Sequence, residues 1–475
     1  MQTITEHKTI CACATGPVQG AIAVIRVSGP DALGITDSIF SPHGKKSLLK
    51  ADAYTILYGD IIHYTGPGNG GDTGNGGDIG LQKNNGIIDN VLVSIFRAPH
   101  SYTGEDSVEI SCHASTYIVQ EILRLLLDAG CSPAQPGEFT QRAFLNGKMD
   151  LSQAEAVADV IASRSAAEHR MAESQMRGAF SAQLKELHDK LLNITSLLEL
   201  EIDFSDHEEL EFADRGQLRT LALEIESVIS RLAGSFRTGN AIKNGIPVAI
   251  IGKTNAGKST LLNALLGEDK AIVSPIQGTT RDSIEDTTVI GGVTFRFIDT
   301  AGIRSTTDTI EALGIQRTFD KLDKAQVVLW MTDRADNSDF EDSSVAEHSS
   351  GKQVLYIHNK ADMMASVPAD YENHLFISAK DGKGIERLTA ALLKVCNIAQ
   401  LDQDNIIVSN IRHYQALTAA LEAIRRVISG LETALPSDLI SQDLRQCLFY
   451  LEDIMGTVTT PDVLSNIFQH FCIGK

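Results

Sequence analysis

The sequence Val248-Ala-Ile-Ile-Gly-Lys-Thr-Asn-Ala-Gly-Lys-Ser-Thr260 decides the class of fold. Its apolar start is typical of a buried parallel strand, and the glycine pattern that follows ends in Lys258 and Ser259. Residues 260–266 then predict a helix. A strand, a glycine loop and a helix in this order form an anion cradle, in which backbone N–H groups point at phosphates. We expect Lys258 to reach the β- and γ-phosphates of a nucleotide and the Ser259 hydroxyl to bind Mg²⁺.

Four further segments follow in the order expected for a nucleotide site. Gly278-Thr-Thr-Arg-Asp282 lies after the first helix, where a threonine hydroxyl can complete the Mg²⁺ shell. Asp299-Thr-Ala-Gly302 follows a predicted strand; its aspartate would hold Mg²⁺ through water, and the Gly302 N–H would meet the γ-phosphate. Asn359-Lys-Ala-Asp362 follows another strand, and Ser378-Ala-Lys380 follows the next. We expect these strand-end segments to line one site.

The pair Asn359 and Asp362 predicts which base is bound. A carboxylate accepts two hydrogen bonds, from guanine N1–H and from the exocyclic amine. Adenine has no N1 donor, so the carboxylate would stay buried and unpaired, which rejects ATP strongly. A chance match is the alternative, and one tetrapeptide alone is weak evidence. Five ordered segments at strand ends argue against chance and predict a GTPase.

One departure from the Ras-like pattern concerns the attacking water. Ras-like GTPases carry a glutamine directly after Asp-x-x-Gly to orient that water, whereas this chain has Ile303 there. An apolar side chain cannot position water, so we expect another group to do so. The sequence also offers no obvious arginine finger, because Arg425-Arg426 lies on a predicted helix and is better explained as a solvated face.

Composition bounds the remaining possibilities. The chain has 475 residues, 43% of them hydrophobic, as in an ordinary globular protein of about three domains. Its seven cysteines form no C-x-x-C pair, which favours reduced thiols. The sequence has no run of ~20 apolar residues and no signal-peptide layout, so we expect a cytoplasmic location and no membrane span. The formal net charge of −20 disfavours non-specific nucleic-acid binding, so a local basic patch or a partner would supply any RNA contact.

The order of predicted elements indicates three structural parts. An α+β region comes first, with a helix at 116–128 and strands at 20–27, 54–64, 87–96 and 108–112. Leucine and isoleucine at helical spacing between 184 and 232 indicate long packed helices, and the chain is predicted helical again from 411. Strands between 248 and 396 alternate with helices, which favours a parallel sheet. The simplest architecture inserts a nucleotide domain between two helical segments that form one bundle.

Three segments outside the nucleotide motifs carry a resemblance. They are Ser101-Tyr-Thr-Gly-Glu-Asp106, Pro136-Gly-Glu-Phe-Thr-Gln-Arg-Ala-Phe-Leu-Asn-Gly-Lys148 and the terminal Phe471-Cys-Ile-Gly-Lys475. Together with the order of motifs, they closely resemble the tRNA modification GTPase family MnmE (TrmE) over nearly the whole chain. The glycine-rich insert at 66–80 and Thr254, where proline is common, depart from the family pattern, and neither touches a proposed ligand.

The resemblance implies a multidomain protein of α/β and α+β class. Its parts would be an N-terminal α+β folate-binding domain that dimerises (1–146), a discontinuous α-helical bundle domain (147–243 and 400–475) and an inserted Ras-like P-loop GTPase domain (244–399). It also implies K⁺-dependent hydrolysis, with nucleotide domains that meet across a homodimer. A monovalent cation beside the β- and γ-phosphates would replace the positive charge of an arginine finger.

The resemblance also assigns residues by motif match. The implied K⁺ ligands are Asn255 and oxygens of Ser274, Ile276 and Thr279, and the implied Mg²⁺ ligands are Ser259 and Thr280. Glu311 matches the acidic residue that helps to orient the water; from the residues alone, a solvated carboxylate at a helix start is the alternative. The full set of expected GTP contacts is Asn255, Ala256, Gly257, Lys258, Ser259, Thr260, Ser274, Thr279, Thr280, Asp299, Thr300, Ala301, Gly302, Asn359, Lys360, Asp362, Ser378, Ala379 and Lys380.

A second set of residues matches the folate contacts of the family: Arg26, Glu109, Lys148 and Lys475. A carboxylate suits the donor edge of a pterin, and cations suit a polyglutamate tail; a surface charge is the alternative for each. Cys472 is implicated in the modification and joins Lys258 and Glu311 as a catalytic candidate, with a small buried helix-end residue as the alternative. Cys11 and Cys13, on a predicted strand, are expected in the core.

The family works with an FAD-containing partner, MnmG, in a heterotetramer. Together they would install an aminomethyl or carboxymethylaminomethyl group at C5 of the wobble uridine of certain tRNAs, with a one-carbon unit from 5-formyl- or methylene-tetrahydrofolate. The rival hypothesis is a GTPase switch in ribosome assembly. Ribosome factors usually carry a basic RNA-binding appendage, and this acidic sequence shows none.

Overall fold

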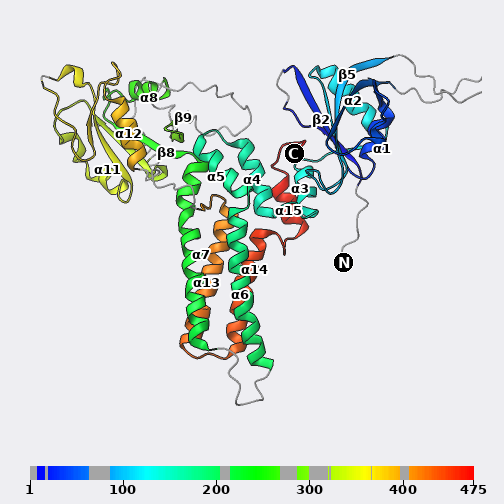
Figure 1. Ribbon diagram of the computed structural model, residues 1–475. Coiled ribbons are helices and arrows are strands. Elements are labelled where there is room, and N and C mark those ends of the chain that lie inside the picture. Colours follow the sequence, from blue (N-terminus) through cyan, green and yellow to red (C-terminus); the bar gives the residue numbers. More distant parts are fainter. Residues whose placement is uncertain are drawn as a thin grey trace, which may run out of the picture. The chain divides into compact units, whose positions relative to one another are not determined.

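The computed structural model describes residues 8–16, 20–63, 86–203, 214–267, 286–298, 319, 322–364, 366–395 and 406–475. The chain divides into two compact units (Figure 1). The N-terminal unit combines residues 1–158 with 455–475, and the second unit comprises residues 159–454. None of the helices described in these ranges is long and apolar enough to cross a membrane.

The N-terminal unit is built on a seven-stranded sheet in the order β3-β4-β5-β6-β2-β1-β7. Neighbouring strands are antiparallel except for β1 and β7. The four strands predicted in this region are confirmed as β2, β4, β5 and β6. The strands are β1 (Ile10–Cys13), β2 (Ile22–Ser28), β3 (Phe40–Pro42), β4 (Thr55–Ile62), β5 (Ile87–Phe96), β6 (Ser107–His113) and β7 (Ser132–Pro133).

One face of this sheet is covered by two helices, α1 (Ala32–Ile39) and α2 (Thr116–Asp128). Successive residues of a strand point to opposite faces of the sheet. Val91, Val93 and Ile95 of β5 are therefore buried together on the face that these helices cover. Cys11 belongs to the same core, as expected, and Cys13 is half-buried against it. The helical face of α2 contributes Ile122, Leu125 and Leu126.

The C-terminal end of the chain belongs to the N-terminal unit. Helix α15 (Pro461–Phe468) packs against α3 (Glu138–Leu145) and α4 (Leu151–Ala162), and the Phe468 side chain is 2% exposed. Gly137 lies directly beneath it at φ +69°, where a Cβ would come within 2.8 Å of the Phe468 carbonyl oxygen. The segment that ends at Lys475 is thereby fixed beside α3.

The second unit contains a bundle of long helices that lie side by side (Figure 1). Leucine and isoleucine at the predicted positions between 184 and 198 are all at most 3% exposed. Arg425 and Arg426 are exposed and form ion pairs with Glu226 and Asp443, as a solvated helix face would. The long helices are α6 (Ala179–Asp203), α7 (Arg215–Asn244), α13 (Ile411–Glu432) and α14 (Ser437–Met455), and the shorter α5 (Ala166–Met176) contacts α6 and α7.

Helix α7 continues through Gly245 into β8, the first strand of a six-stranded sheet with the order β13-β12-β11-β8-β10-β9. The strands pair in parallel, as predicted, except for the β9–β10 hairpin. The strands are β8 (Ile246–Gly252), β9 (Asp286–Ile290), β10 (Val293–Phe297), β11 (Val327–Thr332), β12 (Gln353–His358) and β13 (His374–Phe376). Among the described residues of this region, the helices are α8 (Lys258–Gly267), α11 (Ser343–His348) and α12 (Ile385–Val395).

Candidate functional site

The loop between β8 and α8 has a backbone that only glycine can adopt at two positions. Gly252 has φ +142°, and a Cβ there would lie 2.2 Å from the Met331 carbonyl oxygen. Gly257 has φ +95°, and a Cβ there would lie 2.1 Å from Asn359 Nδ2. Asn255 between them is in the left-handed region at φ +68°. The glycine pattern therefore produces a tight turn that ends at the first residue of a helix, where backbone N–H groups can meet phosphates.

Lys258 is the first residue of α8, and its side chain folds back over the loop. Its Nζ donates hydrogen bonds to the carbonyl oxygens of Gly252 (2.7 Å) and Lys253 (2.8 Å). The ammonium group is thus held above the turn, where a phosphate would meet it. Ser259 follows in the first helical turn and is half-buried, and Thr260 is exposed.

The base-reading segments are tied to the phosphate loop by one side chain. Asn359, which follows β12, is 3% exposed. Its Nδ2 donates to the Ala256 carbonyl oxygen (2.9 Å), and its Oδ1 accepts from the Ala379 N–H (3.0 Å). The amide therefore connects the two loops that sequence analysis assigned to opposite ends of one nucleotide.

The side chain of Asp362 is fixed by a hydrogen bond. Its Oδ1 accepts a hydrogen bond from the Ser378 hydroxyl at 2.7 Å. This bond lowers the pKa of the Asp362 carboxyl, and the Lys380 charge acts in the same direction. The carboxylate is thus ionised at neutral pH, as guanine recognition requires. Lys360 adopts φ +59° and its Nζ donates to Asp333 at 2.8 Å, so its charged end is fixed beside this loop.

The remaining predicted contacts of the nucleotide lie outside the described residues. These are Ser274, Ile276, Thr279, Thr280, Asp299, Thr300, Ala301, Gly302 and Glu311, together with Ile303. The described strand β10 and Ile298 lead directly into the Asp299 segment. For the residues that are described, the geometry suits a nucleotide, because the turn leaves no room for a Cβ and the base-reading carboxylate is ionised and fixed.

The N-terminal unit brings together two residues of the second predicted set, Arg26 and Glu109, beside Gly474, the neighbour of Lys475. Arg26 on β2 lies opposite Glu109 on β6, and its Nε and Nη2 donate to Glu109 Oε1 at 3.0 and 2.8 Å. The third nitrogen, Nη1, donates to the Gly474 carbonyl oxygen at 3.3 Å. The guanidinium carbon lies 5.3 Å from the centre of the Tyr102 ring and 5.6 Å from that of Phe139.

The terminal pentapeptide reaches this site because glycine lets the chain approach closely. Gly474 has φ +91°, and a Cβ there would lie 2.6 Å from the Cys13 carbonyl oxygen. The Cys472 carbonyl oxygen accepts hydrogen bonds from the N–H groups of Gly137 and Lys475. The Cys472 side chain is exposed, so it is not the buried helix-end residue considered as the alternative. Lys148 is bonded through Nζ to the Pro99 carbonyl oxygen at 2.9 Å.

The Ser101–Asp106 segment forms hydrogen bonds with elements that surround this site. The Thr103 hydroxyl hydrogen-bonds Ser28 at 2.7 Å, two residues from Arg26 on the same strand. Glu105 accepts from Arg142, whose side chain is 6% exposed. Tyr102 and Phe139, the aromatic contacts of Arg26, were not predicted, although both lie in the segments that carry the resemblance. Burial raises the pKa of the Tyr102 hydroxyl, which hydrogen-bonds Thr140 at 2.9 Å.

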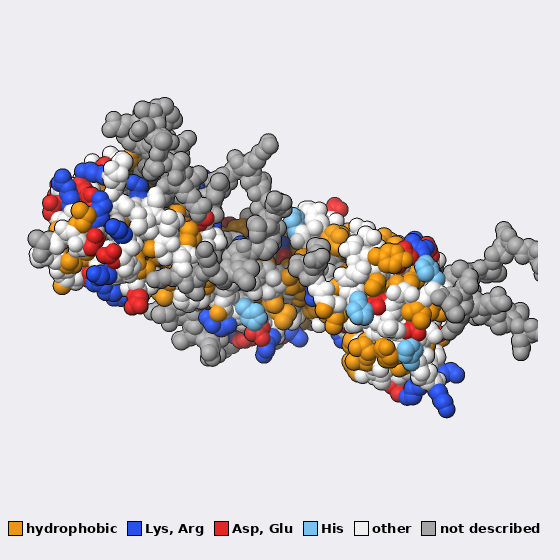
Figure 2. Space-filling view, turned by 90° about the horizontal axis from the view of Figure 1, so that it is seen from above, with side chains coloured by type: hydrophobic (Ala, Val, Ile, Leu, Met, Phe, Trp, Pro, Cys, Tyr) orange, Lys and Arg blue, Asp and Glu red, His pale blue; other side chains and the backbone are white. Residues whose placement is uncertain are grey.

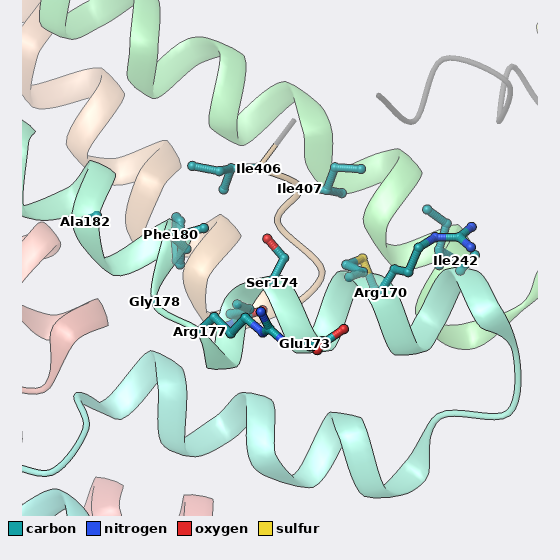
Figure 3. A pocket seen from close by; sticks show the side chains of 14 residues that line it. Arg170, Glu173, Ser174, Arg177, Gly178, Phe180, Ala182, Ile242, Ile406 and Ile407 are labelled. Carbon is teal, nitrogen blue, oxygen red and sulfur yellow. Dashed lines mark hydrogen bonds and ion pairs between the residues drawn. The ribbon is translucent and has the colours of Figure 1, made fainter. Parts of the chain in front are cut away.

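A separate cavity of about 700 Å³ lies in the second unit, between α5, α6, the end of α7 and residues 406–407 (Figure 3). Its lining contains no residue predicted to bind GTP or folate. Two arginines, Arg170 and Arg177, lie on its α5 side, and Arg177 is paired with Glu173 at 2.6 Å.

The fold and the nucleotide site define a Ras-like P-loop GTPase. The protein-family model for the MnmE helical domain matches residues 151–472 of the sequence. The protein-family model for the N-terminus of GTP-binding protein TrmE matches residues 9–148. The tRNA modification GTPases MnmE of Parabacteroides distasonis and Bacteroides thetaiotaomicron are 59% and 56% identical to this chain, over 98% and 99% of its length and all of theirs. That of Christiangramia forsetii is 48% identical over 99% of both.

This chain belongs to the MnmE family of tRNA modification GTPases. It is therefore a GTP hydrolase, as the five motifs predicted. GTPases of this fold bind their nucleotide with Mg²⁺.

Proposed function

We propose that this chain is a K⁺-dependent GTPase that modifies C5 of the wobble uridine of certain tRNAs together with an FAD-containing partner, MnmG. The group installed would be aminomethyl or carboxymethylaminomethyl, with its one-carbon unit from 5-formyl- or methylene-tetrahydrofolate. The observation that carries the proposal is that this member of the family has two clusters of hydrogen-bonded residues at predicted ligand-binding positions. One is the loop pair joined by Asn359, and the other is the Arg26–Glu109 pair beside the terminal pentapeptide.

In the nucleotide site, the described residues bind and orient GTP. The N–H groups at the start of α8 and the Lys258 ammonium stabilise phosphate oxygens that gain charge in the transition state. Asn359 and Asp362 hold the base, with Lys360, Ser378, Ala379 and Lys380 beside it. Mg²⁺ would be held by Ser259 and Thr280 and would neutralise phosphate charge when bound.

A monovalent cation replaces an arginine finger in this proposal. Asn255, with Ser274, Ile276 and Thr279, would supply oxygen ligands for K⁺ beside the β- and γ-phosphates. The left-handed backbone at Asn255 supports this assignment. At φ +68°, asparagine is favoured over most other residues, so the loop conformation and the proposed ligand fit the same residue type. Glu311 would orient the attacking water in place of the absent glutamine, since Ile303 offers no polar group.

In the N-terminal unit, Glu109 would accept hydrogen bonds from the donor edge of a pterin, and Arg26 would hold that carboxylate in place. Lys148 and Lys475 would bind the carboxylates of a polyglutamate tail. The exposure of the Cys472 side chain supports access of its thiol to a substrate at this site. The docked Gly474 carbonyl, bonded to Arg26, supports the view that the pentapeptide is part of the folate site.

A homodimer through the N-terminal unit completes the proposal. The sheet face away from α1 and α2 exposes large apolar side chains, and Figure 2 shows hydrophobic groups on the surface of this unit. Those on β2, β4 and β5 are between 47% and 65% exposed, which favours a covered face in the functional protein. They are Ile22, Ile56, Tyr58 and Leu92.

The experiment that tests the proposal is mass spectrometry of tRNA nucleosides from cells that lack this chain. The C5 group of the wobble uridine should disappear, return with the wild-type chain and remain absent with Lys258→Ala. Unchanged nucleosides together with accumulated ribosomal precursors would support the rival function in ribosome assembly. The net charge of −20 disfavours that rival, because ribosomal RNA binding depends on phosphate neutralisation.

A further inference from the structure

The first turn of α5 contacts the β9–β10 hairpin of the nucleotide sheet through two hydrogen bonds. The Ala167 N–H donates to the Gly292 carbonyl oxygen at the hairpin turn (3.1 Å). The Thr294 hydroxyl on β10 donates to Glu168 Oε1 (2.5 Å). We call these four residues, Ala167, Glu168, Gly292 and Thr294, the α5–hairpin joint.

The Glu168 carboxylate makes this joint sensitive to small displacements. The residue is 7% exposed and accepts hydrogen bonds from the Arg164 N–H (2.7 Å), the Ser165 hydroxyl (3.0 Å) and Thr294. Its own N–H donates to the Ser165 hydroxyl at 3.3 Å, so Ser165 caps the start of α5. Because a buried charge needs its full set of donors, the carboxylate is well satisfied only while Thr294 stays in place.

The hairpin connects the two segments in which the γ-phosphate contacts are predicted. Residues 268–285, with Thr279 and Thr280, precede β9, and residues 299–302 follow Ile298 at the end of β10. A change in the first segment would reach Gly292 through β9 and Gly291, and a change in the second would reach Thr294 through residues 295–298. The joint is therefore one place where the nucleotide sheet can act on a helix outside it.

A second connection lies at Gly245, where α7 passes into β8. Gly245 has φ +77°, and a Cβ there would lie 3.2 Å from Thr294 Cγ2. The nucleotide sheet is thus attached to the helical bundle at a glycine and, beside it, at the joint, and Ala167, Ala241 and Ile242 are buried in the same apolar core as the sheet. Rotation about Gly245 alone would pull Thr294 away from Glu168.

We propose that the α5–hairpin joint transmits the nucleotide state of the GTP site to the helical bundle, with Gly245 as the hinge. Beyond its first turn, α5 lines the cavity of about 700 Å³ with Arg170 and Ser174, and Ile242 of α7 lies beside Arg170 at one end of it (Figure 3). Movement at the joint would therefore reshape this cavity. The inference rests on the proposed GTP cycle.

Hydrogen exchange of the full chain tests the joint directly, because the Ala167 amide is itself one of its two bonds. Exchange is followed in peptides covering residues 165–172 and 252–262, with Mg²⁺, K⁺ and either GDP or a non-hydrolysable GTP analogue. Thr294→Val removes the hydroxyl that donates to Glu168. Thr288→Val is the matched control: it is equally buried, at 6% against 7% exposed, and its hydroxyl bonds Leu265 within the nucleotide part.

In the wild type, exchange at 165–172 should differ between the two nucleotides. Thr294→Val should accelerate it by about 10- to 100-fold, the range that corresponds to one lost hydrogen bond to a charged group, and should remove the nucleotide dependence. The 252–262 peptide should stay protected by nucleotide, and Thr288→Val should behave as wild type. If Thr294→Val folds poorly by thermal unfolding, Glu168→Gln, which keeps the shape and removes the charge, should give the same loss.

Two results would overturn the joint while leaving the GTP site intact. One is protection at 252–262 without any nucleotide dependence at 165–172 in the wild type. The other is an unchanged nucleotide dependence in Thr294→Val and Glu168→Gln. Absence of protection at 252–262 in the wild type would instead overturn the nucleotide site and the joint together.

Discussion

Replacing Asn359 by alanine should lower the free energy of unfolding of the nucleotide part of the protein. The side chain is 3% exposed and fills the gap between the phosphate loop and the Ser378–Lys380 loop. Its amide joins the Ala256 carbonyl to the Ala379 N–H, which are themselves in residues 1% and 5% exposed. Asn359→Ala would leave both backbone groups buried without this partner.

The expected magnitude follows from those two groups. Leaving a buried donor or acceptor unsatisfied costs about 1–3 kcal/mol each, so the variant should lose about 2–6 kcal/mol in free energy of unfolding. Entry of water into the vacated space would bring the value toward the lower end. GDP affinity should also fall by more than about tenfold, because both loops that the amide connects are proposed to contact the nucleotide.

Denaturant unfolding followed by tryptophan fluorescence measures this loss. The single tryptophan, Trp330, is buried on β11, the neighbour of the strand that ends before Asn359, so the signal reports the nucleotide sheet. Asn373→Ala, at an exposed residue before β13, is the matched control and should change stability by less than about 0.5 kcal/mol. A loss below 1 kcal/mol for Asn359→Ala, or an unchanged GDP affinity, would refute the reasoning.

Three further predictions concern turnover and pH. Turnover should need KCl and be slow in NaCl at equal ionic strength, since the smaller ion fits the Asn255 oxygen site badly; equal rates would contradict this. Glu311→Ala should reduce single-turnover hydrolysis by about 10²–10⁴-fold while GTP affinity persists; turnover within threefold of wild type would remove it from the catalytic residues. Burial, and then the neighbouring His358, lower the pKa of His374. The unfolded chain therefore binds a proton first, and the free energy of unfolding should fall as pH drops below about 6.5. His374→Gln should reduce that slope, and an identical slope would exclude this histidine as its source.

Periodicity and motif context predicted most of the fold. Leu184, Leu191 and Leu198 recur at helical spacing and are fully buried on α6, and the apolar runs at 327–331 and 354–357 form parallel strands. A strand was predicted at 295–298, which is β10, but β9 and the hairpin turn were not predicted, although Gly291-Gly292 between two β-branched runs is a turn signal. Strand β9 has five residues and only two of them are buried, so its apolar pattern is weak.

The residues of the site were predictable where the functional side chains belong to one contiguous motif. Lys258, Asn359 and Asp362 were assigned from strand-end segments alone, and the structure brings their loops together. The long-range partners were not predictable in this way. Arg26 meets Gly474 across most of the sequence, and Glu168 meets Thr294 of the hairpin, because such contacts depend on how separate elements pack and leave no local pattern.

The central claim, that guanine-nucleotide turnover at this site drives tRNA modification, is tested most directly by changing the base that the site accepts. In Asp362→Asn, an amide can donate to the C2 oxygen of xanthine, where a carboxylate cannot. tRNA from cells lacking the chain is incubated with purified protein, the FAD-containing partner and the folate, with GTP or XTP, and its nucleosides are analysed by mass spectrometry. The wild type should modify wobble uridine with GTP only, and Asp362→Asn should do so with XTP. Modification without any nucleotide, or an unaltered preference for GTP in Asp362→Asn, would contradict the claim.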